Sequence, residues 1–261
     1  MSSAYTISTE VGHTGHIILN RPEVHNAMHI GMIREISEAI REFDNRDGIR
    51  IIFISANGQN FSAGADLNWM KEGLKQDKEA LYRESRELAG LFNTIYNASK
   101  ITVALAKGKV MGGANGIVAA ADIPIAITGT SFAFSEVKLG LVPATIAPYI
   151  VQRTGKAAAY EWMLSGRLFT AEEALEKGLI SRIIPEEEAD QPGELLDPLL
   201  RNGPEAMKGI KRMFREQHLD QHPDQLIEST SQLIAEYRVS EEGQEGIRAF
   251  FEKRQPRWTD E

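Results

Sequence analysis

Apolar residues recur every three to four positions in two long stretches, 28–43 and 78–97, which predicts an amphipathic helix in each. Runs of apolar and β-branched residues between turn residues predict several short strands. These strands are expected at 5–11, 16–19, 50–55, 101–106 and 122–128. Because strands and helices alternate along the chain, we expect an α/β architecture with parallel strand pairing.

The pattern changes near residue 185. Before it, helices are predicted at 156–164 and after the capping box Thr170–Glu173, followed by a last strand at 180–184. After it comes an acidic stretch with Pro and Gly, and then three amphipathic helical patterns, near 204–218, 223–238 and 241–254. We therefore predict two domains, an α/β core at 1–190 and a helical region at 191–261.

The 261 residues include 29 Lys and Arg against 37 Asp and Glu, a net charge of −8. This charge disfavours nonspecific binding to nucleic acid or to a membrane surface. The chain has no cysteine, which excludes disulfides and thiolate chemistry and fits a reducing compartment. The first residues lack the pattern of a signal peptide, and no window approaches 18 apolar residues, the length of a membrane span. We therefore expect a cytoplasmic protein.

Two segments rich in small residues each follow a strand and open a helix. One is the turn Gly112–Gly113 before the small-residue helix expected at 114–121, and the other is 61–67. Glycine lets another molecule approach the backbone closely, and the first N–H groups of a helix have no partner inside it. The N–H groups of Ala65 and Gly113 are therefore candidate donors to an anion or a developing oxyanion. Plain close packing is the alternative reading of the glycines.

Glu136 lies within the apolar run 132–142. Desolvation raises the pKa of a carboxyl in such company toward the range useful for acid–base catalysis. The alternative is a structural ion pair with Lys138 or Arg153. A second carboxylate, Asp66, stands where a helix begins and is interpreted as its cap.

Neither a dinucleotide site nor a metal site is expected. The Gly-x-Gly-x-x-Gly motif of nicotinamide-dependent dehydrogenases does not follow the first strand. His25 and His29 have i,i+4 spacing, but no carboxylate stands at the register that a metal site would need. We expect no metal and no cofactor.

Four stretches carry recurrent motifs, namely Leu19–Met28, Phe61–Leu67, Gly112–Ile123 and Phe134–Pro143. Together they resemble the crotonase superfamily, the enoyl-CoA hydratase/isomerase family. Their order and spacing agree with that family, and the resemblance extends to 245–253. Within the family, the segment 135–149 is similar to bacterial methylglutaconyl-CoA and isohexenylglutaconyl-CoA hydratases.

The resemblance implies a spiral of ββα units with a C-terminal helical region that packs in trimers, often paired into hexamers. It implies an acyl-CoA thioester as substrate, in fatty acid metabolism or leucine degradation, and a lyase that adds water across a 2-enoyl-CoA. The oxyanion hole of the family would fall on the N–H groups of Ala65 and Gly113, with Glu136 as general acid and base.

The resemblance also implies a set of residues along the substrate path, with Lys253, from a neighbouring subunit, meeting a CoA phosphate. The set comprises Ala63, Ala65, Asp66, Leu67, Asn68, Gly112, Gly116, Ala144 and Lys253.

The sequence departs from the family pattern at two positions. Typical hydratases of the family carry a second glutamate where this chain has Gly116, and a glycine where it has Ala144. The space at Gly116 would admit a branched or carboxylated acyl chain such as that of 3-methylglutaconyl-CoA. Two alternatives stay open. One is a Δ3-Δ2 enoyl-CoA isomerase, for which one glutamate suffices. The other is a non-catalytic acyl-CoA binder, which the missing glutamate favours and Glu136 opposes.

Overall fold

The computed structural model describes residues 5–189, 191–216 and 222–259. The chain divides into two compact units, 1–190 and 191–261. The first unit mixes strands and helices, as predicted for an α/β fold, and the second is helical. Within the described ranges, no helix combines the length and the apolar character that crossing a membrane would require.

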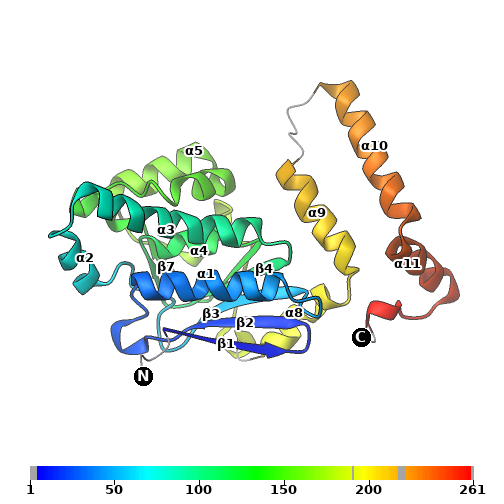
Figure 1. The fold of residues 1–261 in the computed structure, drawn as a ribbon, viewed down its shortest axis with the longest axis horizontal. Helices are drawn as coiled ribbons and strands as arrows, with labels where there is room; N and C mark the ends of the chain where they lie inside the picture. The colour runs from blue at the N-terminus through cyan, green and yellow to red at the C-terminus, as the bar shows by residue number, and fades with distance from the viewer. Residues whose placement is uncertain (1–4, 190, 217–221, 260–261) are drawn as a thin grey trace. The chain divides into compact units, whose positions relative to one another are not determined.

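The main sheet of the first unit has six strands, and its inner strands pair in parallel (Figure 1). Only β1 is antiparallel to its neighbour, β2. Every residue of β4 is buried, as expected for a parallel strand covered on both faces. In order across the sheet, the strands are β1 (Thr6–Val11), β2 (Thr14–Leu19), β3 (Ile51–Ala56), β4 (Ile101–Ala106), β6 (Ile123–Ile127) and β9 (Arg182–Ile184).

A second, smaller sheet contains β5 (Lys109–Met111), β7 (Ser131–Ala133) and β8 (Phe169–Thr170). Strand β5 follows β4 after a short turn, and β7 follows β6 in the same way. Each pair therefore contributes one strand to each sheet before the chain enters a helix. This alternation is the repeated ββα arrangement that the family resemblance predicts.

Helices cover the main sheet and pack on one another. Helix α1 (Ile30–Asp44) contacts β1 to β3 and also α3 (Lys78–Asn97). Helix α4 (Ala114–Ala120) is buried at every position between β4, α3 and α5 (Ala147–Ser165), which its small side chains permit. The other helical segments of this unit are η1 (Pro22–Val24), α2 (Leu67–Gly73), η2 (Ser135–Leu139), α6 (Ala171–Glu176) and α7 (Glu186–Ala189).

Several predicted boundaries differ from the observed ones. Helix α1 begins at Ile30 rather than at 28, because Met28 is held in a bridge to another segment and His29 caps the helix. Helix α5 begins at Ala147 rather than at 156, and Gly155, with φ 71° and ψ 169°, interrupts its helical pattern. Strands β5, β7 and β8 were not predicted, since two or three residues are too few to show an alternating pattern.

The second unit contains four α-helices in its described part. They are α8 (Pro192–Leu200), α9 (Pro204–Glu216), α10 (Pro223–Val239) and α11 (Glu241–Glu252), and η3 (Arg257–Thr259) follows them. Helix α8 was not predicted. The helix predicted at 204–218 corresponds to α9, and its residues 217 and 218 lie outside the described residues. The carboxylate of Glu242 accepts hydrogen bonds from the N–H groups of Glu205 and Ala206, so α11 caps the N-terminus of α9.

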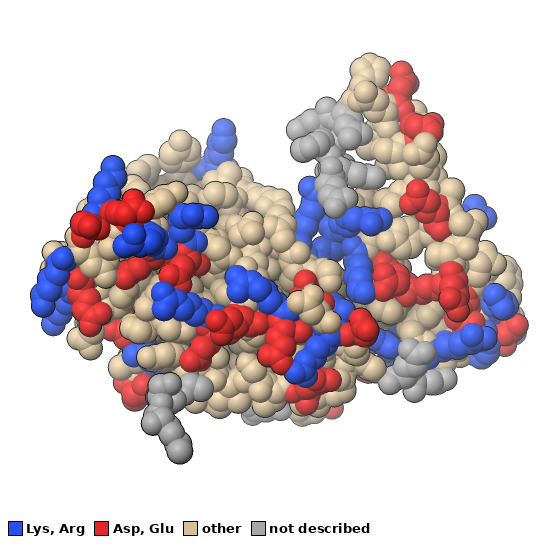
Figure 2. All heavy atoms as spheres, viewed as in Figure 1, with Lys and Arg blue, Asp and Glu red and all other residues tan. Residues whose placement is uncertain are grey.

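Charges of both signs are interspersed over the face formed by α1 and α3 (Figure 2). A groove of about 450 Å³ between these helices is lined by four arginines, together with Glu38 and Glu87. Arg34 donates two hydrogen bonds to Glu87, of 2.5 and 2.8 Å, which neutralises part of the positive charge. The mixture leaves no extended field of one sign on the visible face of these helices.

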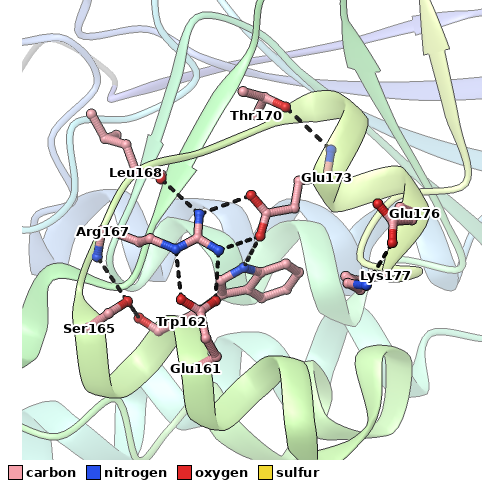
Figure 3. Close-up of polar contacts among 9 residues, drawn as sticks. All are labelled: Glu161, Trp162, Ser165, Arg167, Leu168, Thr170, Glu173, Glu176 and Lys177. Atoms are coloured by element: carbon pink, nitrogen blue, oxygen red, sulfur yellow. Dashed lines mark hydrogen bonds and ion pairs between the residues drawn. The ribbon is translucent and has the colours of Figure 1, made fainter.

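Arg167 links the end of α5 to α6 (Figure 3). Its guanidinium donates to both carboxylate oxygens of Glu161, at 2.7 Å each, and also binds Glu173. Glu173 accepts a further bond from Trp162 Nε1 at 2.8 Å. The Oγ of Thr170 caps α6 by accepting from the Glu173 N–H, as predicted, but the Glu173 carboxylate is bound to Arg167 and so does not complete the capping box.

We expect Glu173→Gln to destabilise the protein by about 1 kcal/mol at pH 7, since partly exposed ion pairs contribute no more than this. The hydrogen bond from Arg167 lowers the pKa of Glu173 to about 2. The stabilising effect is therefore fully present above the ordinary carboxyl pKa, and it is lost as the pH falls toward 2. Urea unfolding at pH 7, 4 and 2.5 measures this. Glu176→Gln, which removes an exposed pair with Lys177, is the control, and an equal loss in both variants at pH 7 would contradict the prediction.

Candidate active site

Three chain segments run side by side in parallel at the second sheet. Ser62 pairs with Val110, and Val110 pairs with Phe132. Because paired parallel segments point the same way, residues at equal distances beyond these pairs emerge at the same edge. Three positions further along the three segments stand Ala65, Gly113 and Ser135. The pairing therefore brings the segments that carry the two candidate amides and Glu136 together at one edge.

The N–H of Ala65 points away from the chain that holds it. The Gly64 carbonyl accepts a 2.7 Å bond from the Met28 N–H, and the Asp66 N–H donates a 2.9 Å bond to the Met28 carbonyl. Because a trans peptide is planar, the Ala65 N–H lies opposite the Gly64 carbonyl and so faces away from Met28. Ala65 is exposed, and its N–H has no hydrogen-bond acceptor within the described residues.

Gly113 is the residue before the first turn of α4. Gly112, just before it, has φ 53°, which favours glycine, and its N–H donates to the Ala133 carbonyl at 2.9 Å. The Gly113 N–H itself finds no acceptor among residues that the structure describes, and Gly113 is partly exposed. This is the arrangement that makes a helix N-terminus a hydrogen-bond donor site.

The Glu136 carboxyl faces the Gly112–Gly113 turn. Its Oε1 lies 3.3 Å from the position that a Cβ on Gly112 would occupy, so glycine leaves the space in front of the carboxyl open. Its Oε2 is buried and has no partner in the described part of the chain. Burial raises the pKa of Glu136 above the usual glutamate value.

Glu136 is not held in the ion pair that was the alternative. Arg153 donates instead to the backbone carbonyls of Ala119, Ala121 and Asp122. Lys138 is exposed, and within the described ranges it forms no ion pair with Glu136. A carboxyl kept unpaired in a partly buried position at an open turn is the pattern expected of an acid–base group.

Asn115 fixes the turn that carries Gly113. It is fully buried, and its Nδ2 donates to the carbonyls of Gly112 at 2.9 Å and Ala133 at 3.0 Å. These bonds tie the start of α4 to the end of β7. The side-chain nitrogen of Asn115 therefore serves the backbone around the site.

The expectation that Gly116 leaves room for an acyl branch is wrong. A Cβ on Gly116 would lie 2.5 Å from Ile146 Cγ2 and 2.6 Å from Phe92 Cε1. Both residues are buried, and they fill the space that a side chain at 116 would need. A second glutamate is absent, and its place is packed with hydrocarbon. The sequence did contain one signal of this packing. A buried helix of small residues, α4, must be covered by large apolar side chains, and Phe92 of α3 and Ile146 before α5 are such side chains.

The other expected substrate residues are distributed as follows. Asp66 is buried, and its Oδ1 accepts from the N–H groups of Asn68 and Trp69, so the predicted cap of α2 is confirmed. Lys253 belongs to the second unit and ends α11 with φ 55°. The exposed residues are Ala63, Leu67, Asn68 and Ala144, whereas Gly112 is buried.

An apolar groove of about 370 Å³ lies between the turn 137–143 and both halves of α5. Its walls include the exposed side chains of Leu141 and Val142, and Lys156 is the charged residue among those that line it. The lining of the groove includes Val137, the residue that follows Glu136 in the chain. It offers hydrophobic surface for part of a ligand.

His25 and His29, the two histidines with i,i+4 spacing, both contact other groups of the protein. His29 Nδ1 accepts from the Gly31 N–H at 3.1 Å, and His25 Nδ1 is 3.0 Å from Asn60 Nδ2. In the described part of the chain, no cluster of three or more His, Cys, Asp or Glu side chains is arranged to bind a metal ion.

We expect Gly116→Ala to destabilise the protein by about 1–3 kcal/mol, because the new methyl group overpacks a filled core site. Ile146→Ala removes one of the two clashing groups. The double variant should therefore be more stable than the sum of the two single losses indicates. Urea unfolding of the four proteins measures the coupling, and simple additivity would show that Ile146 does not occupy this space.

Comparison with known proteins identifies the family. The model of the family described as enoyl-CoA hydratase/isomerase matches residues 12–261. An enoyl-CoA hydratase from Shewanella pealeana is 40% identical, with a TM-score of 0.91 over 97% of this chain and 96% of that one. A structure from Legionella pneumophila, described provisionally as an enoyl-CoA hydratase/isomerase (crotonase), is 35% identical, with a TM-score of 0.95 over 98% of this chain and 100% of that one.

A relative of similar length supports the same grouping. The enoyl-CoA hydratase EchA19 of Mycobacterium tuberculosis is 32% identical over 94% of this chain and 92% of its own length. The family match covers nearly the whole chain, and the ββα repeats are those of this fold. The protein is thus an enzyme of the enoyl-CoA hydratase/isomerase family, within the crotonase superfamily.

Proposed function

We propose that the protein is a hydratase that adds water across the double bond of a 2-enoyl-CoA thioester. The observation that carries this proposal is the placement of one carboxyl group with a raised pKa beside a turn whose Gly113 amide has no acceptor among the residues that the structure describes. The Ala65 amide, which likewise has no acceptor in the described ranges, is carried by the segment that the Ser62–Val110 pairing brings to the same edge. The relatives named as hydratases support this choice.

The two amides would bind the thioester oxygen. Hydrogen bonds from the N–H groups of Ala65 and Gly113 polarise the C=O bond, which makes the β-carbon of the conjugated ester electrophilic. As water attacks that carbon, negative charge develops on the thioester oxygen, where both donors are already in place. One such donor contributes about 3 kcal/mol to transition-state stabilisation.

Glu136 would handle the protons. Its carboxylate takes a proton from water while the oxygen bonds to the β-carbon and the C=C π electrons move toward the thioester oxygen as an enolate. The resulting carboxylic acid then returns a proton to the α-carbon, and the enolate collapses to the thioester. The products are the 3-hydroxyacyl-CoA and the original carboxylate, so no cofactor is consumed. The raised pKa of Glu136 suits a group that must both accept and donate a proton near neutral pH.

A Δ3-Δ2 enoyl-CoA isomerase is the second candidate, and a specific observation favours it. Phe92 and Ile146 fill the place of the second glutamate, so a single carboxyl must serve the reaction. Moving a proton between the α- and γ-carbons needs only one base, together with the same two amides. The two reactions differ in whether solvent oxygen enters the product.

The acyl chain would lie against the apolar groove beside the turn 137–143. Lys156 at this groove would favour a chain that ends in a carboxylate, such as the 3-methylglutaconyl group, whereas the remaining wall favours hydrocarbon. The filled space at Gly116 gives no support to a branch at that position. The test panel therefore includes both straight and carboxylated chains.

We expect Glu136→Gln to lower kcat on the best 2-enoyl-CoA by about 10²-fold or more, because the amide cannot transfer a proton. In the wild-type enzyme, kcat/KM should fall as the pH drops through the raised pKa of Glu136, starting above the range of an ordinary glutamate. Absorbance assays on crotonyl-CoA, methylglutaconyl-CoA and a 3-enoyl-CoA measure this, with the exposed Glu188→Gln as control.

Product analysis in ¹⁸O-water separates the candidate functions. A hydratase places labelled oxygen at the β-carbon, whereas an isomerase converts the 3-enoyl ester without incorporating label. Near-normal turnover by Glu136→Gln would remove Glu136 from the mechanism. Tight binding of the esters with no turnover by the wild-type enzyme would favour a non-catalytic acyl-CoA binder.

We also propose that the second unit assembles the chain into trimers, as the family resemblance implies. Its helices carry large apolar side chains that are exposed in the single chain, among them Phe214, Phe250 and Phe251 at 64%, 78% and 77%. Apolar surface of this kind marks association sites. Lys253, next to this group in sequence, would then be available to a CoA phosphate.

We expect the purified protein to sediment as a trimer or a pair of trimers. Replacing Phe250 and Phe251 with serine should shift it toward the monomer, because burial of two aromatic rings is lost from the interface. Sedimentation equilibrium measures the mass. A wild-type protein that stays monomeric at micromolar concentration would contradict the proposal.

A further inference from the structure

The Leu19–Met28 motif has no role in the chemistry derived so far, yet its polar groups converge beside the site. The Arg21 side chain is 17% exposed, and its Nη2 lies 2.8 Å from Asp66 Oδ2. Its Nη1 donates to the Ala27 carbonyl at 2.7 Å. The guanidinium also lies over the Tyr5 ring, 5.4 Å from its centroid. Arg21 is therefore held on several sides and reaches into the segment that carries Ala65.

Asn26 makes the loop that carries Arg21 rigid. It is fully buried, and its Oδ1 accepts from the Arg21 N–H at 2.7 Å. Its Nδ2 donates to the carbonyls of Asn57 and Asn60, at 2.8 Å each. Asn26 also adopts φ 53°, a conformation that asparagine tolerates better than most residues. These bonds fix the loop to the end of β3, so Arg21 is anchored to the main sheet.

Asp66 links Arg21 to the backbone beside Ala65. Both of its carboxylate oxygens are used, Oδ1 by the first amides of α2 and Oδ2 by Arg21. Burial raises the pKa of Asp66, but the hydrogen bonds from Arg21 and from the α2 amides outweigh it and hold the pKa below the usual aspartate value. The Asp66 carboxylate is thus ionised and held in place at neutral pH. Asp66 directly follows Ala65, whose N–H is the candidate oxyanion donor.

The peptide between Gly64 and Ala65 is clamped from both ends. On one side its carbonyl is bonded to Met28, and on the other Asp66 is bonded to Met28 through its N–H and to Arg21 through its side chain. We propose that Arg21, acting through Asp66, is a positioning residue that fixes the direction of the Ala65 N–H toward the thioester oxygen. This inference rests on the proposed use of that amide as an oxyanion donor.

The proposal predicts a change in kcat rather than in substrate affinity. Without the Arg21 bond, the segment keeps only its two backbone bonds to Met28. The Asp66 side chain is then free to move, and the Ala65 N–H is held less firmly in line with an oxygen whose charge grows in the transition state. Misplacement by about 1 Å can lower a rate by about 10²-fold. We therefore expect Arg21→Gln to lower kcat about 10- to 100-fold, with little change in KM.

A set of variants separates positioning from folding. Asp66→Asn keeps a good helix cap while it removes the charge partner of Arg21. It should lower kcat as Arg21→Gln does, and the double variant should be no worse than either single variant. Arg21→Lys retains a donor and should restore part of the rate. Arg46→Gln, which breaks an exposed pair with Glu10, is the control for loss of an arginine charge.

A truncated substrate separates positioning from contact with the CoA phosphates. An enoyl N-acetylcysteamine thioester has the reacting group but no nucleotide. Under the proposal, Arg21→Gln lowers kcat on this thioester by the same factor as on the CoA ester. A loss confined to KM for the full CoA ester would overturn the proposal and indicate a phosphate contact instead.

An infrared measurement tests the inference without turnover. A ¹³C-labelled thioester carbonyl bound to Glu136→Gln enzyme should absorb at lower wavenumber than in water, and adding Arg21→Gln or Asp66→Asn should reduce this shift. An unchanged shift in these variants would overturn the positioning role. A bound ester that shows no shift even with Arg21 intact would instead contradict the proposed oxyanion site. If Arg21→Gln does not fold, Asp66→Asn and Arg21→Lys give the same comparison.

Discussion

The parallel pairing of Ser62 with Val110, and of Val110 with Phe132, is the constraint on which the candidate site depends. It joins segments that lie far apart in the chain and sets them in one register, so that their continuations leave the sheet together. The ββα repeat brings this about, because β5 and β7 each follow a strand of the main sheet into the smaller sheet, and the segment after β3 joins them through the Ser62 bridge. The amides of Ala65 and Gly113 and the carboxyl of Glu136 are thus contributed by successive repeats of one architecture.

At this edge of the smaller sheet, the site combines two amide donors and the Glu136 Oε2 atom, none of which has a hydrogen-bond partner among the described residues. An unpaired, partly buried carboxyl disfavours the ionised form, which is why the pKa of Glu136 is raised. Arg153, Asn26 and Asp66 show that other buried polar groups have partners. In the described part of the chain, the buried side-chain oxygens without a partner are Gln76 Oε1, Asn115 Oδ1 and Glu136 Oε2, and the last two lie at the Gly112 turn. The contrast between these satisfied groups and the open set around Gly112 identifies the candidate site on physical grounds.

Part of this was accessible from the sequence. Helix α3 and strand β4 have the predicted bounds, because a long amphipathic pattern and a short apolar run between turns are strong local signals. The cap at Asp66 was equally local. The pairing of Ser62 with Val110 was not accessible, because it is long-range and its strands are too short to show periodicity. The packing of Phe92 and Ile146 onto Gly116 likewise depends on contacts between distant segments, so the absent side chain was misread as open space.

The packing around Gly116 has an evolutionary consequence. If a relative with two glutamates gave rise to this chain, the core has since closed over the vacated position, and a single substitution that restores the carboxyl would meet both an aromatic ring and a methyl group. Restoring a glutamate at 116 would first require smaller residues in place of Phe92 and Ile146, and each of these substitutions would leave a cavity. The local packing therefore opposes the return of a second carboxyl at this position.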